Sequence, residues 1–252
     1  MPKNSAVRSP KAFRPSSGNT DGDGREVGNI ILRGLPRNES SQLFPSLEFV
    51  RLQLHQVLHE AGEEIRSGYF LNSGLGSVLT TEPDGKTVEV GLIGKEGFVG
   101  VPVIFGFKTS GLRVITQGDG TAYRVDVDTL LRILPRCPEL AKQLQRFSMM
   151  MGMQSTQLAA CNRLHDVVER LARWLLMSHD RIGGATLPLT QGSSPRCWAS
   201  VTVAAGTLQK AGMSQYSRGS VSILDRLKLE ADACDCYQLI ERRKLKWQEE
   251  AS

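Results

Sequence analysis

Between residues 47 and 126, apolar and polar side chains alternate along short segments, as in EFVRLQL at 48–54. A two-residue period places the apolar side chains on one face of a strand, and glycine-rich turn signals separate the segments. In TEPDGKTVEV, Asp84-Gly85 supplies a residue that tolerates the positive φ of a hairpin turn. Many short strands joined by such turns predict an antiparallel β-barrel or jelly roll, which we assign to residues 29–136.

The periodicity becomes helical in residues 137–180. Apolar residues recur there at steps of four and three through five heptads, which is the 3.5-residue period of a coiled coil. A helix of about 40 residues spans about 60 Å, too long for one small domain to cover, so we expect it to pair with a second copy of the chain. The alternative is a long helix packed on the core of its own domain. The predicted dimer seam consists of Leu144, Phe147, Met151, Gln154, Leu158, Cys161, His165 and Val168.

Residues 181–252 combine helical and strand-like patterns. The segment SVTVAAGTLQKAG at 200–212 places apolar side chains on one helical face and ends at a glycine, as helices commonly do. MSQYSRGSVSILD at 213–225 alternates on both sides of a Ser-Arg-Gly turn and predicts a β-hairpin. A last amphipathic helix follows at 227–250. We therefore expect an α+β chain with a barrel first, a long helix next and a compact unit of helices and a hairpin last.

Composition and charge narrow the function classes. The net charge of +5 is uneven: residues 29–180 hold 16 Lys+Arg and 16 Asp+Glu, whereas residues 181–252 hold 10 and 7, an excess of three. A neutral body with a basic C-terminal end is typical of a module that faces nucleic acid. Residues 1–28 are rich in Pro, Ser and Gly and predict a disordered tail. The sequence shows neither a long apolar run nor a secretory signal, so we expect a cytoplasmic protein that binds no membrane.

Candidate catalytic and metal-binding chemistry is sparse. Five cysteines, at 137, 161, 197, 234 and 236, form neither a disulfide framework nor paired Cys-x-x-Cys motifs, which fits a reducing compartment. The Cys-Asp-Cys at 234–236 supplies only two thiolates, too few to indicate a metal site. The barrel segments contain no carboxylate pair and no nucleophile beside a base, and the four histidines are scattered. We therefore expect neither a metal nor an enzymatic activity.

Several segments resemble the Crp/Fnr family of bacterial transcription regulators. GEEIRSGYFLNSGLGSVL and GLIGKEGFVGVPV are similar to its effector-binding barrel, and ACNRLHDVVERLARWLLMSHDRIGG is similar to its long helix and the hinge that follows. The segments at 200–212 and 213–225 resemble its recognition helix and wing. The resemblance implies a cyclic-nucleotide-binding-like barrel, a dimerisation helix and a C-terminal winged helix-turn-helix. It also implies double-stranded DNA, a second copy of the chain and RNA polymerase as partners, with a small molecule as effector.

The phosphate-binding segment of that family is altered in this chain. Its cyclic-nucleotide-binding members hold the phosphate with backbone amides, a Gly-Glu pair and an arginine. The matching stretch EGFVGVPVIFGFKTSGLRVITQ offers Gly97, Gly100, Val101 and Arg113 as candidate effector-binding residues. Val101 stands where the glutamate is expected, and Arg113 lies beyond the expected arginine, where one step along a strand reverses the face. These departures argue against a cyclic nucleotide and favour a different effector, or none.

The segment GSSPRCWA at 192–199 interrupts the resemblance. Family members carry a full positioning helix, a turn and an arginine pair here, whereas this stretch is shorter and keeps Arg196 as its only cation. Pro195 would break a helix begun any earlier, so we expect the first helix of the motif to be shortened or lost. A family peptide written in GC-rich codons and translated one base out of frame gives Ser-Ser-Pro-Arg-Cys-Trp-Ala. A local frameshift is therefore one hypothesis for the origin of the segment.

Sequence-specific contacts to DNA begin at the N-terminal residues of a recognition helix. The candidate DNA-binding residues are Arg196, Ser200, Thr202, Gln209, Lys210, Ser217 and Arg218. Two hypotheses follow from the altered segment. The first is a homodimeric DNA-binding transcription regulator with an effector-sensing barrel. The second is a dimeric ligand-sensing or interaction protein whose helix-turn-helix is defective.

Overall fold

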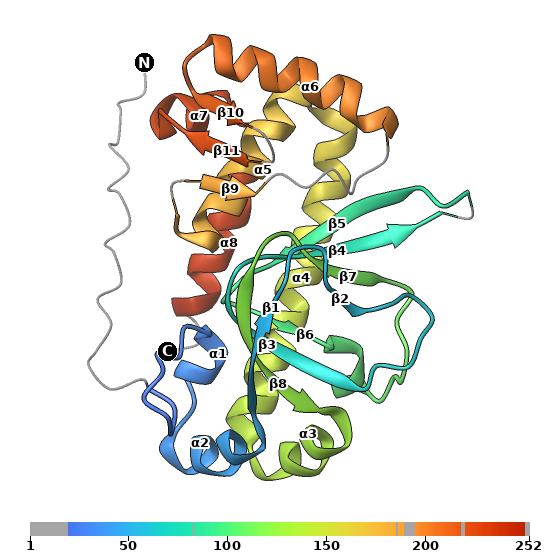
Figure 1. Cartoon of the computed structure of the whole chain (residues 1–252), viewed down its shortest axis with the longest axis vertical. Coiled ribbons are helices and arrows are strands. Elements are labelled where there is room, and N and C mark those ends of the chain that lie inside the picture. Colours follow the sequence, from blue (N-terminus) through green and yellow to red (C-terminus); the bar gives the residue numbers. More distant parts are fainter. Residues whose placement is uncertain (1–19, 83, 185, 189–194, 218–219, 250–252) are drawn as a thin grey trace.

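The computed structural model describes residues 20–82, 84–184, 186–188, 195–217 and 220–249. A β-barrel occupies the lower half of Figure 1, a long helix runs along it, and a smaller unit of helices and strands lies at the upper end. The order of elements confirms the α+β fold class predicted from the sequence. Among the described helices, none combines the length and the apolar character that a membrane span requires.

The barrel consists of two four-stranded antiparallel sheets. The first has the order β1-β8-β3-β6, with β1 Glu48–Leu52, β8 Gly120–Asp126, β3 Ser67–Ser73 and β6 Phe98–Val99. The second has the order β2-β7-β4-β5, with β2 Val57–His59, β7 Arg113–Thr116, β4 Gly76–Thr81 and β5 Thr87–Ile93. The predicted jelly roll and its hairpin are confirmed, and Gly85 takes the expected positive φ of 80°. Phe70 and Phe98, with ring centroids 4.6 Å apart, lie in the apolar core.

The barrel domain begins earlier than the sequence predicts. Tyr123 Oη donates to Asp21 Oδ2 at 3.0 Å, Gly28 N donates to Asn72 Oδ1 at 2.6 Å, and Val27 is buried. Residues 20–28 therefore lie against the barrel, and the predicted disordered tail is wrong for them, while residues 1–19 lie outside the described part. The helical turns of this domain are α1 Ile30–Arg33, α2 Arg37–Leu43, η1 Phe44–Ser46, η2 Val101–Phe105, α3 Val127–Ile133 and η3 Leu134–Arg136.

The single helix predicted over residues 137–180 is two helices, α4 Pro138–Leu164 and α5 Val167–Ile182. His165 and Asp166 between them have extended backbone angles. The Asp166 side chain accepts hydrogen bonds from Val168 N and Glu169 N, and Glu169 Oε2 accepts from Asp166 N at 2.9 Å. This reciprocal pair is a capping box, which starts a new helix at this point. The prediction of one continuous helix is therefore wrong, because the cap redirects the chain into the C-terminal unit.

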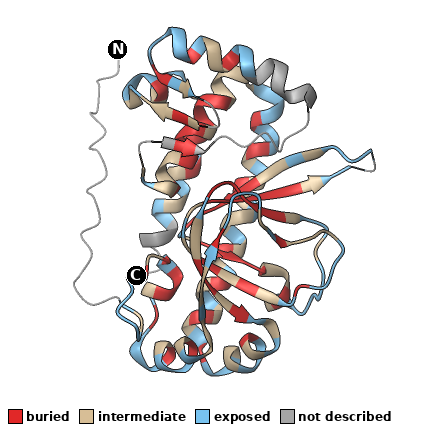
Figure 2. Ribbon diagram, viewed as in Figure 1, coloured by how far each residue is buried: buried red, intermediate tan, exposed pale blue. Residues whose placement is uncertain are grey.

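Most of the predicted dimer seam is buried within its own chain, and Figure 2 shows buried positions alternating with exposed ones along the long helix. Buried there are Leu144, Phe147, Gln154, Leu158 and Cys161, and partly buried are Met151, His165 and Val168. Leu144 and Phe147 belong to the barrel core, and Leu158 belongs to a second core shared with α5. The assignment of this face to a partner is therefore wrong for its five buried positions. The alternative, a helix packed on the core of its own domain, fits these positions. A heptad period shows which side chains share a face, but it does not show what covers that face.

The C-terminal unit contains a three-stranded antiparallel sheet of order β10-β11-β9. Its elements are β9 Thr186–Pro188, α6 Pro195–Lys210, β10 Ser214–Ser217, β11 Ser220–Ile223, α7 Arg226–Asp232 and α8 Cys236–Glu249. The predicted hairpin is confirmed as β10–β11, whereas the predicted last helix is divided into α7 and α8. Between β9 and β10 the described residues form one helix, α6, and residues 192–194 lie outside the described part. No separate positioning helix precedes α6 within the described residues.

Candidate functional site

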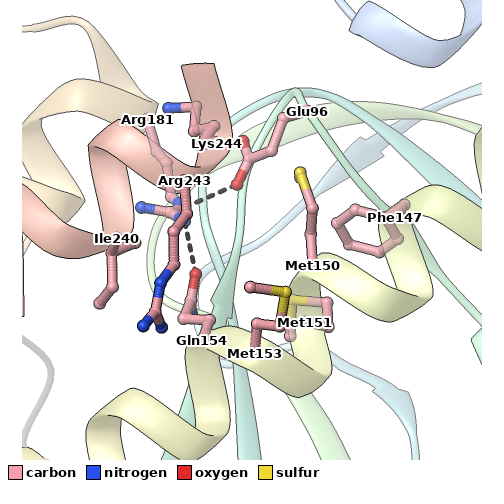
Figure 3. A pocket seen from close by; sticks show the side chains of 10 residues that line it. All are labelled: Glu96, Phe147, Met150, Met151, Met153, Gln154, Arg181, Ile240, Arg243 and Lys244. Carbon is pink, nitrogen blue, oxygen red and sulfur yellow. Dashed lines mark hydrogen bonds and ion pairs between the residues drawn. The ribbon is translucent and has the colours of Figure 1, made fainter. Parts of the chain in front are cut away.

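A buried ion pair joins the barrel to α5, the helix that leads into the C-terminal unit (Figure 3). Glu96 lies in the turn between β5 and β6, Gln154 lies on α4, and Arg181 lies in the last turn of α5. Arg181 Nε donates to Glu96 Oε1 at 2.7 Å, and Arg181 Nη2 donates to Gln154 Oε1 at 2.9 Å. The Arg181 side chain is 4% exposed and the Glu96 side chain 9%. Charge-assisted bonds strengthen away from water, so this pair fixes the position of α5 on the barrel.

The charges around Glu96 keep it ionised. Burial raises the pKa of its carboxyl group, but the cations of Arg181 and Lys244 outweigh burial and hold the pKa below its ordinary value. Beside the pair lies a cavity of about 40 Å³, with methionines of α4 on one side and Ile240, Arg243 and Lys244 of α8 on the other. This volume is large enough for water, whereas a nucleotide needs a pocket of roughly several hundred Å³. The site therefore has a structural role, and we call Glu96, Gln154 and Arg181 the joint.

A second carboxylate, Glu89 on β5, bonds to the same helix. Trp174 Nε1 on α5 donates to Glu89 Oε1 at 2.7 Å, and Ser77 Oγ on β4 donates to Glu89 Oε2 at 2.5 Å. Gln117 Nε2 donates to Ser77 Oγ, which extends the network into the barrel. Burial raises the pKa of Glu89, and the hydrogen bonds from Ser77 and Trp174 offset part of that rise. Two polar connections therefore run from β5 and the turn after it to α5.

Three of the predicted effector residues flank β6. A Cβ on Gly97 would lie 2.5 Å from the Phe147 ring, so this glycine permits close packing of α4 on the barrel. Gly100 has a φ of 117°, and a Cβ there would lie 3.3 Å from both Gly68 and the Phe98 ring. Val101 begins η2 and packs on the barrel core. The local geometry of these positions is that of tight packing.

The fourth predicted effector residue, Arg113, lies on β7 in the other sheet. Its Nε is 3.0 Å from Glu60 Oε2, and about a third of the side chain is exposed. A cation that already faces a carboxylate has less electrostatic attraction left for a phosphate. The sequence analysis did not identify Glu60 as the ion-pair partner of Arg113.

The structure describes some of the predicted DNA-binding residues in full. Thr202, Gln209 and Lys210 lie on the exposed side of α6, and Ser217 is exposed at the end of β10. Gln209 Oε1 accepts from Tyr216 N at 3.1 Å, and the Ser217 and Ser220 hydroxyl oxygens lie 2.6 Å apart. Arg196 and Ser200 belong to α6, but their side chains, like the whole of Arg218, lie outside the described residues. The hydrogen bond from Tyr216 N to Gln209 therefore holds the hairpin beside α6, and both elements carry exposed predicted residues.

A cluster of three cysteines was missed by the sequence analysis. Cys161 near the end of α4 meets Cys234 and Cys236 at the α7–α8 junction, and the three Sγ atoms lie within 4.8 Å of one another. Burial, followed by the contact with Cys161, raises the pKa of Cys234 to about 12. The Cys-Asp-Cys motif was visible in the sequence, but Cys161 is 73 positions from Cys234. The expectation that only two thiolates are available at this place is therefore wrong.

Comparisons with known proteins agree with this architecture. Residues 49–137 match the family model described as cyclic nucleotide-binding domain. A putative transcriptional regulator of the Crp/Fnr family from Eubacterium rectale has a TM-score of 0.59 at 15% identity, covering 81% of this chain and 97% of its own. FixK2 from Bradyrhizobium japonicum gives 0.62 at 14% identity, covering 75% and 98% respectively.

The c-di-GMP-responsive global regulator CLP of Xanthomonas campestris gives a TM-score of 0.60 at 16% identity, covering 75% of this chain and 99% of its own. No match was found among curated protein sequences. The barrel, the long helix and the C-terminal unit follow in the same order as the sequence resemblance implied. Residues 49–137 are thus similar to a cyclic nucleotide-binding domain, and the chain has the fold seen in these three regulators, one of which is described as a member of the Crp/Fnr family.

Proposed function

We propose that this protein is a DNA-binding transcription regulator in which the state of the barrel sets the position of α6. The observation that carries the proposal is the pair of polar connections, Glu96–Arg181 and Glu89–Trp174, between the barrel and α5. The α6 helix packs on α5, with Ala204 and Leu208 buried in the core that they share. An effector that displaces the β5–β6 turn would therefore move α5 and α6 together, which is a shift between two states.

The DNA-facing side is proposed to be the exposed side of α6 together with the β10–β11 hairpin. Thr202 and Lys210 are exposed on α6, and Ser217 is exposed at the end of β10. Thr and Ser hydroxyls bond to bases or phosphates, and lysine supplies a phosphate contact. Gln209 contributes by holding the hairpin to α6 through Tyr216 N. Arg196, Ser200 and Arg218 stay candidates of the same surface, and a contact with RNA polymerase stays a prediction.

The effector is proposed to be a small molecule other than a cyclic nucleotide. Arg113 faces Glu60, and Gly97 and Gly100 are closely packed against aromatic rings, so the predicted phosphate site offers little free charge or space. A phosphodiester in such a domain needs a fixed cation and oriented backbone amides. The predicted effector residues Gly97, Gly100, Val101 and Arg113 therefore stay candidates, and their packing favours an effector that needs no phosphate site.

A homodimer is proposed through the face of α4 opposite the buried seam. Its exposed positions recur at steps of three and four: Lys142, Gln145, Met149, Gly152, Thr156, Ala159 and Arg163. Nothing lies within 4 Å of a Cβ built on Gly152, so two helices can approach closely there. Light scattering on the purified chain tests the proposal, and a monomer at working concentration would contradict it.

DNA binding is tested by selection from a pool of random duplexes, followed by fluorescence anisotropy at several salt concentrations. We expect binding that weakens as salt rises, because lysine and arginine contacts release counterions from phosphates. Replacing Lys210 by alanine should lower the salt slope by about one and weaken binding to all sequences alike. The matched control is Lys86→Ala, at the exposed turn of the β4–β5 hairpin, which should leave binding unchanged.

The second candidate is a dimeric ligand-sensing or interaction protein with a defective helix-turn-helix. It is favoured by one observation: the described residues between β9 and β10 form a single helix that starts at Pro195. Absence of salt-dependent binding to any selected duplex would support this candidate and overturn the first. Resequencing the gene over the codons for residues 185–205 tests the frameshift hypothesis, and clean in-frame codons unlike those of family members would contradict it.

A further inference from the structure

Three buried thiols meet where the long helix of the barrel domain touches the C-terminal unit. Cys161 Sγ and Cys234 Sγ lie 3.4 Å apart, and Cys236 Sγ lies within 4.8 Å of both. All three residues are at most 4% exposed. Their burial comes from two separate parts of the chain, the end of α4 and the α7–α8 junction. The cluster is thus a tertiary feature, distinct from the joint around Glu96 and from the exposed side of α6.

The geometry suits one ion held by three sulfurs. Bonds from thiolate sulfur to a thiophilic metal are about 2.3 Å long, so sulfurs on a common ion must lie within about 4.6 Å of each other. The spacing of the cluster meets this condition with side-chain adjustments of a few tenths of an ångström, roughly. A structural zinc site requires four protein ligands, whereas the candidate group among the described residues contains three. The neighbouring polar group is the Gln157 amide, whose Nε2 donates to Cys236 Sγ at 3.2 Å.

Charge decides which thiophilic ion fits best. Three thiolates carry three negative charges, so a monovalent ion leaves two uncompensated charges at the site and a divalent ion leaves one. Uncompensated charge is costly in a buried place, and the amide beside these sulfurs is neutral. A trivalent ion with three thiolates is neutral overall. A trivalent metalloid also accepts three ligands on one side, which matches sulfurs that converge from two segments.

We propose that Cys161, Cys234 and Cys236 form a binding site for a trivalent, thiophilic metalloid of the arsenite type. Arsenous acid, As(OH)₃, enters as a neutral molecule. Three As–S bonds form as three As–O bonds break, and each thiol proton leaves with a hydroxide as water. Arsenic stays in the +3 state, so the exchange needs neither oxidant nor reductant. Reactants and products are all neutral, so the exchange leaves no net charge in the buried site.

The bound metalloid would act as a cross-link between α4 and the C-terminal helices. The cluster bridges Cys161, one turn before α4 ends, to the short segment that joins α7 to α8. A three-way covalent link there fixes α8 against α4, and Gln157 already contacts Arg243 Nη1 through its Oε1 at 3.3 Å. The site therefore offers the C-terminal unit an input separate from the barrel effector. It stands on the cysteine geometry alone and does not depend on DNA binding.

The test uses the full chain, reduced and free of metal, with Cys197→Ser as the background so that four thiols remain. Arsenite is titrated while ultraviolet absorbance from arsenic–sulfur bonds is followed, and native mass spectrometry counts the adducts. We expect one arsenic per chain. Alkylation followed by peptide mass spectrometry should find Cys161, Cys234 and Cys236 protected and the fourth thiol, Cys137, unprotected once the chain is unfolded.

The matched control is Cys137→Ser, which removes an equally buried cysteine from the barrel core and should leave arsenite binding unchanged. Cys161→Ser, Cys234→Ser and Cys236→Ser should each abolish the one-to-one adduct, and circular dichroism reports whether each variant is folded. If a variant is unfolded, protection mapping on the parent chain carries the test by itself. Zinc and copper(I) serve as competing probes. The proposal is overturned by an adduct that survives Cys161→Ser, by zinc or copper(I) displacing arsenite, or by no adduct.

Discussion

The barrel and the C-terminal unit complete their apolar cores in different ways. The barrel buries its side chains among its own strands and helices, from Val27 near the start to Phe147 on α4. The core of the C-terminal unit instead continues onto the barrel, since Leu75 and Leu92 are buried in the same cluster as Leu208 of α6. The barrel core is thus complete within the barrel domain, whereas the core of the C-terminal unit includes residues of the barrel.

This difference shows how a signal can pass between the two parts. Domains in one chain move relative to each other unless the interface between them is large and apolar. Here a shared apolar core is combined with the Glu96–Arg181 and Glu89–Trp174 connections, so we expect the two parts to move together. The apolar contacts supply attraction that is insensitive to direction, whereas the polar bonds specify one position. The predictions below separate these two contributions.

The largest effect is expected at Arg181. Replacing it by alanine leaves Glu96 buried without its closest cation, and breaking a buried ion pair on one side costs about 3–5 kcal/mol. We expect the free energy of unfolding, measured by urea denaturation, to fall by that amount. The matched control is Arg66→Ala, which breaks the exposed pair with Glu64 and should cost less than about 1 kcal/mol. Equal effects of the two substitutions would show that the joint does not hold the parts together.

A second variant distinguishes lost charge balance from lost packing. The double substitution Glu96→Gln with Arg181→Met removes both charges and keeps similar side-chain volumes. Replacing both partners of a buried pair is often close to neutral, so the double variant should recover most of the stability that Arg181→Ala loses. It should also weaken the coupling of the barrel to α6, because the directional bonds of Arg181 are absent and the Glu89–Trp174 bond alone remains.

The next effect concerns the shared core. Leu208 on α6 is fully buried, and truncating a buried leucine to alanine costs about 2–5 kcal/mol through lost burial and the cavity left behind. We expect Leu208→Ala to lower the free energy of unfolding within this range. Val203 on the same helix is 71% exposed, so Val203→Ala should change it by less than about 0.5 kcal/mol. If both variants lower the free energy of unfolding by the same small amount, the core that α6 shares with the barrel does not stabilise α6.

The barrel could be predicted from the sequence because its information is local. Strand alternation and the Asp84-Gly85 turn are short-range patterns, and both are found in the structure. The break between α4 and α5 also had a local signal, the Asp166-x-x-Glu169 capping box. The heptad pattern continues through that box, and the longer pattern concealed the shorter one. A cap should therefore take precedence over a seam that runs through it.

The joint and the cysteine cluster could not be predicted, because their partners are distant in the chain. Glu96 and Arg181 are 85 positions apart, and neither position has a spacing that marks a pair. The face of α4 that meets the barrel has the same period as a coiled-coil seam, so periodicity alone cannot distinguish them. Which surface covers a helix is decided by the tertiary fold, and that information is absent from a single helical pattern.

The smallest effects are expected from pH. Glu89 and Glu96 should change the free energy of unfolding with opposite pH dependence. The pKa of Glu89 is raised in the folded protein above its ordinary 4.5, so its contribution to stability is full below that value and is lost as pH rises through the folded pKa. The pKa of Glu96 is lowered, so its contribution is present above 4.5 and is lost as pH falls through the folded pKa. Both signs follow from which state of the chain binds the proton more tightly.

Urea denaturation from acidic to neutral pH tests this opposition. Glu89→Gln removes the titrating group and keeps an oxygen that can accept a hydrogen bond from Trp174. It should therefore abolish the loss of stability that occurs as the pH rises. Glu96→Gln should abolish the loss on the acidic side and should also weaken the bond to Arg181. Changes of the same sign in both variants would contradict the assignment. Opposite signs would mean that protonation at acidic pH relieves the cost of burying the Glu89 charge, whereas it removes the charge by which Glu96 holds Arg181.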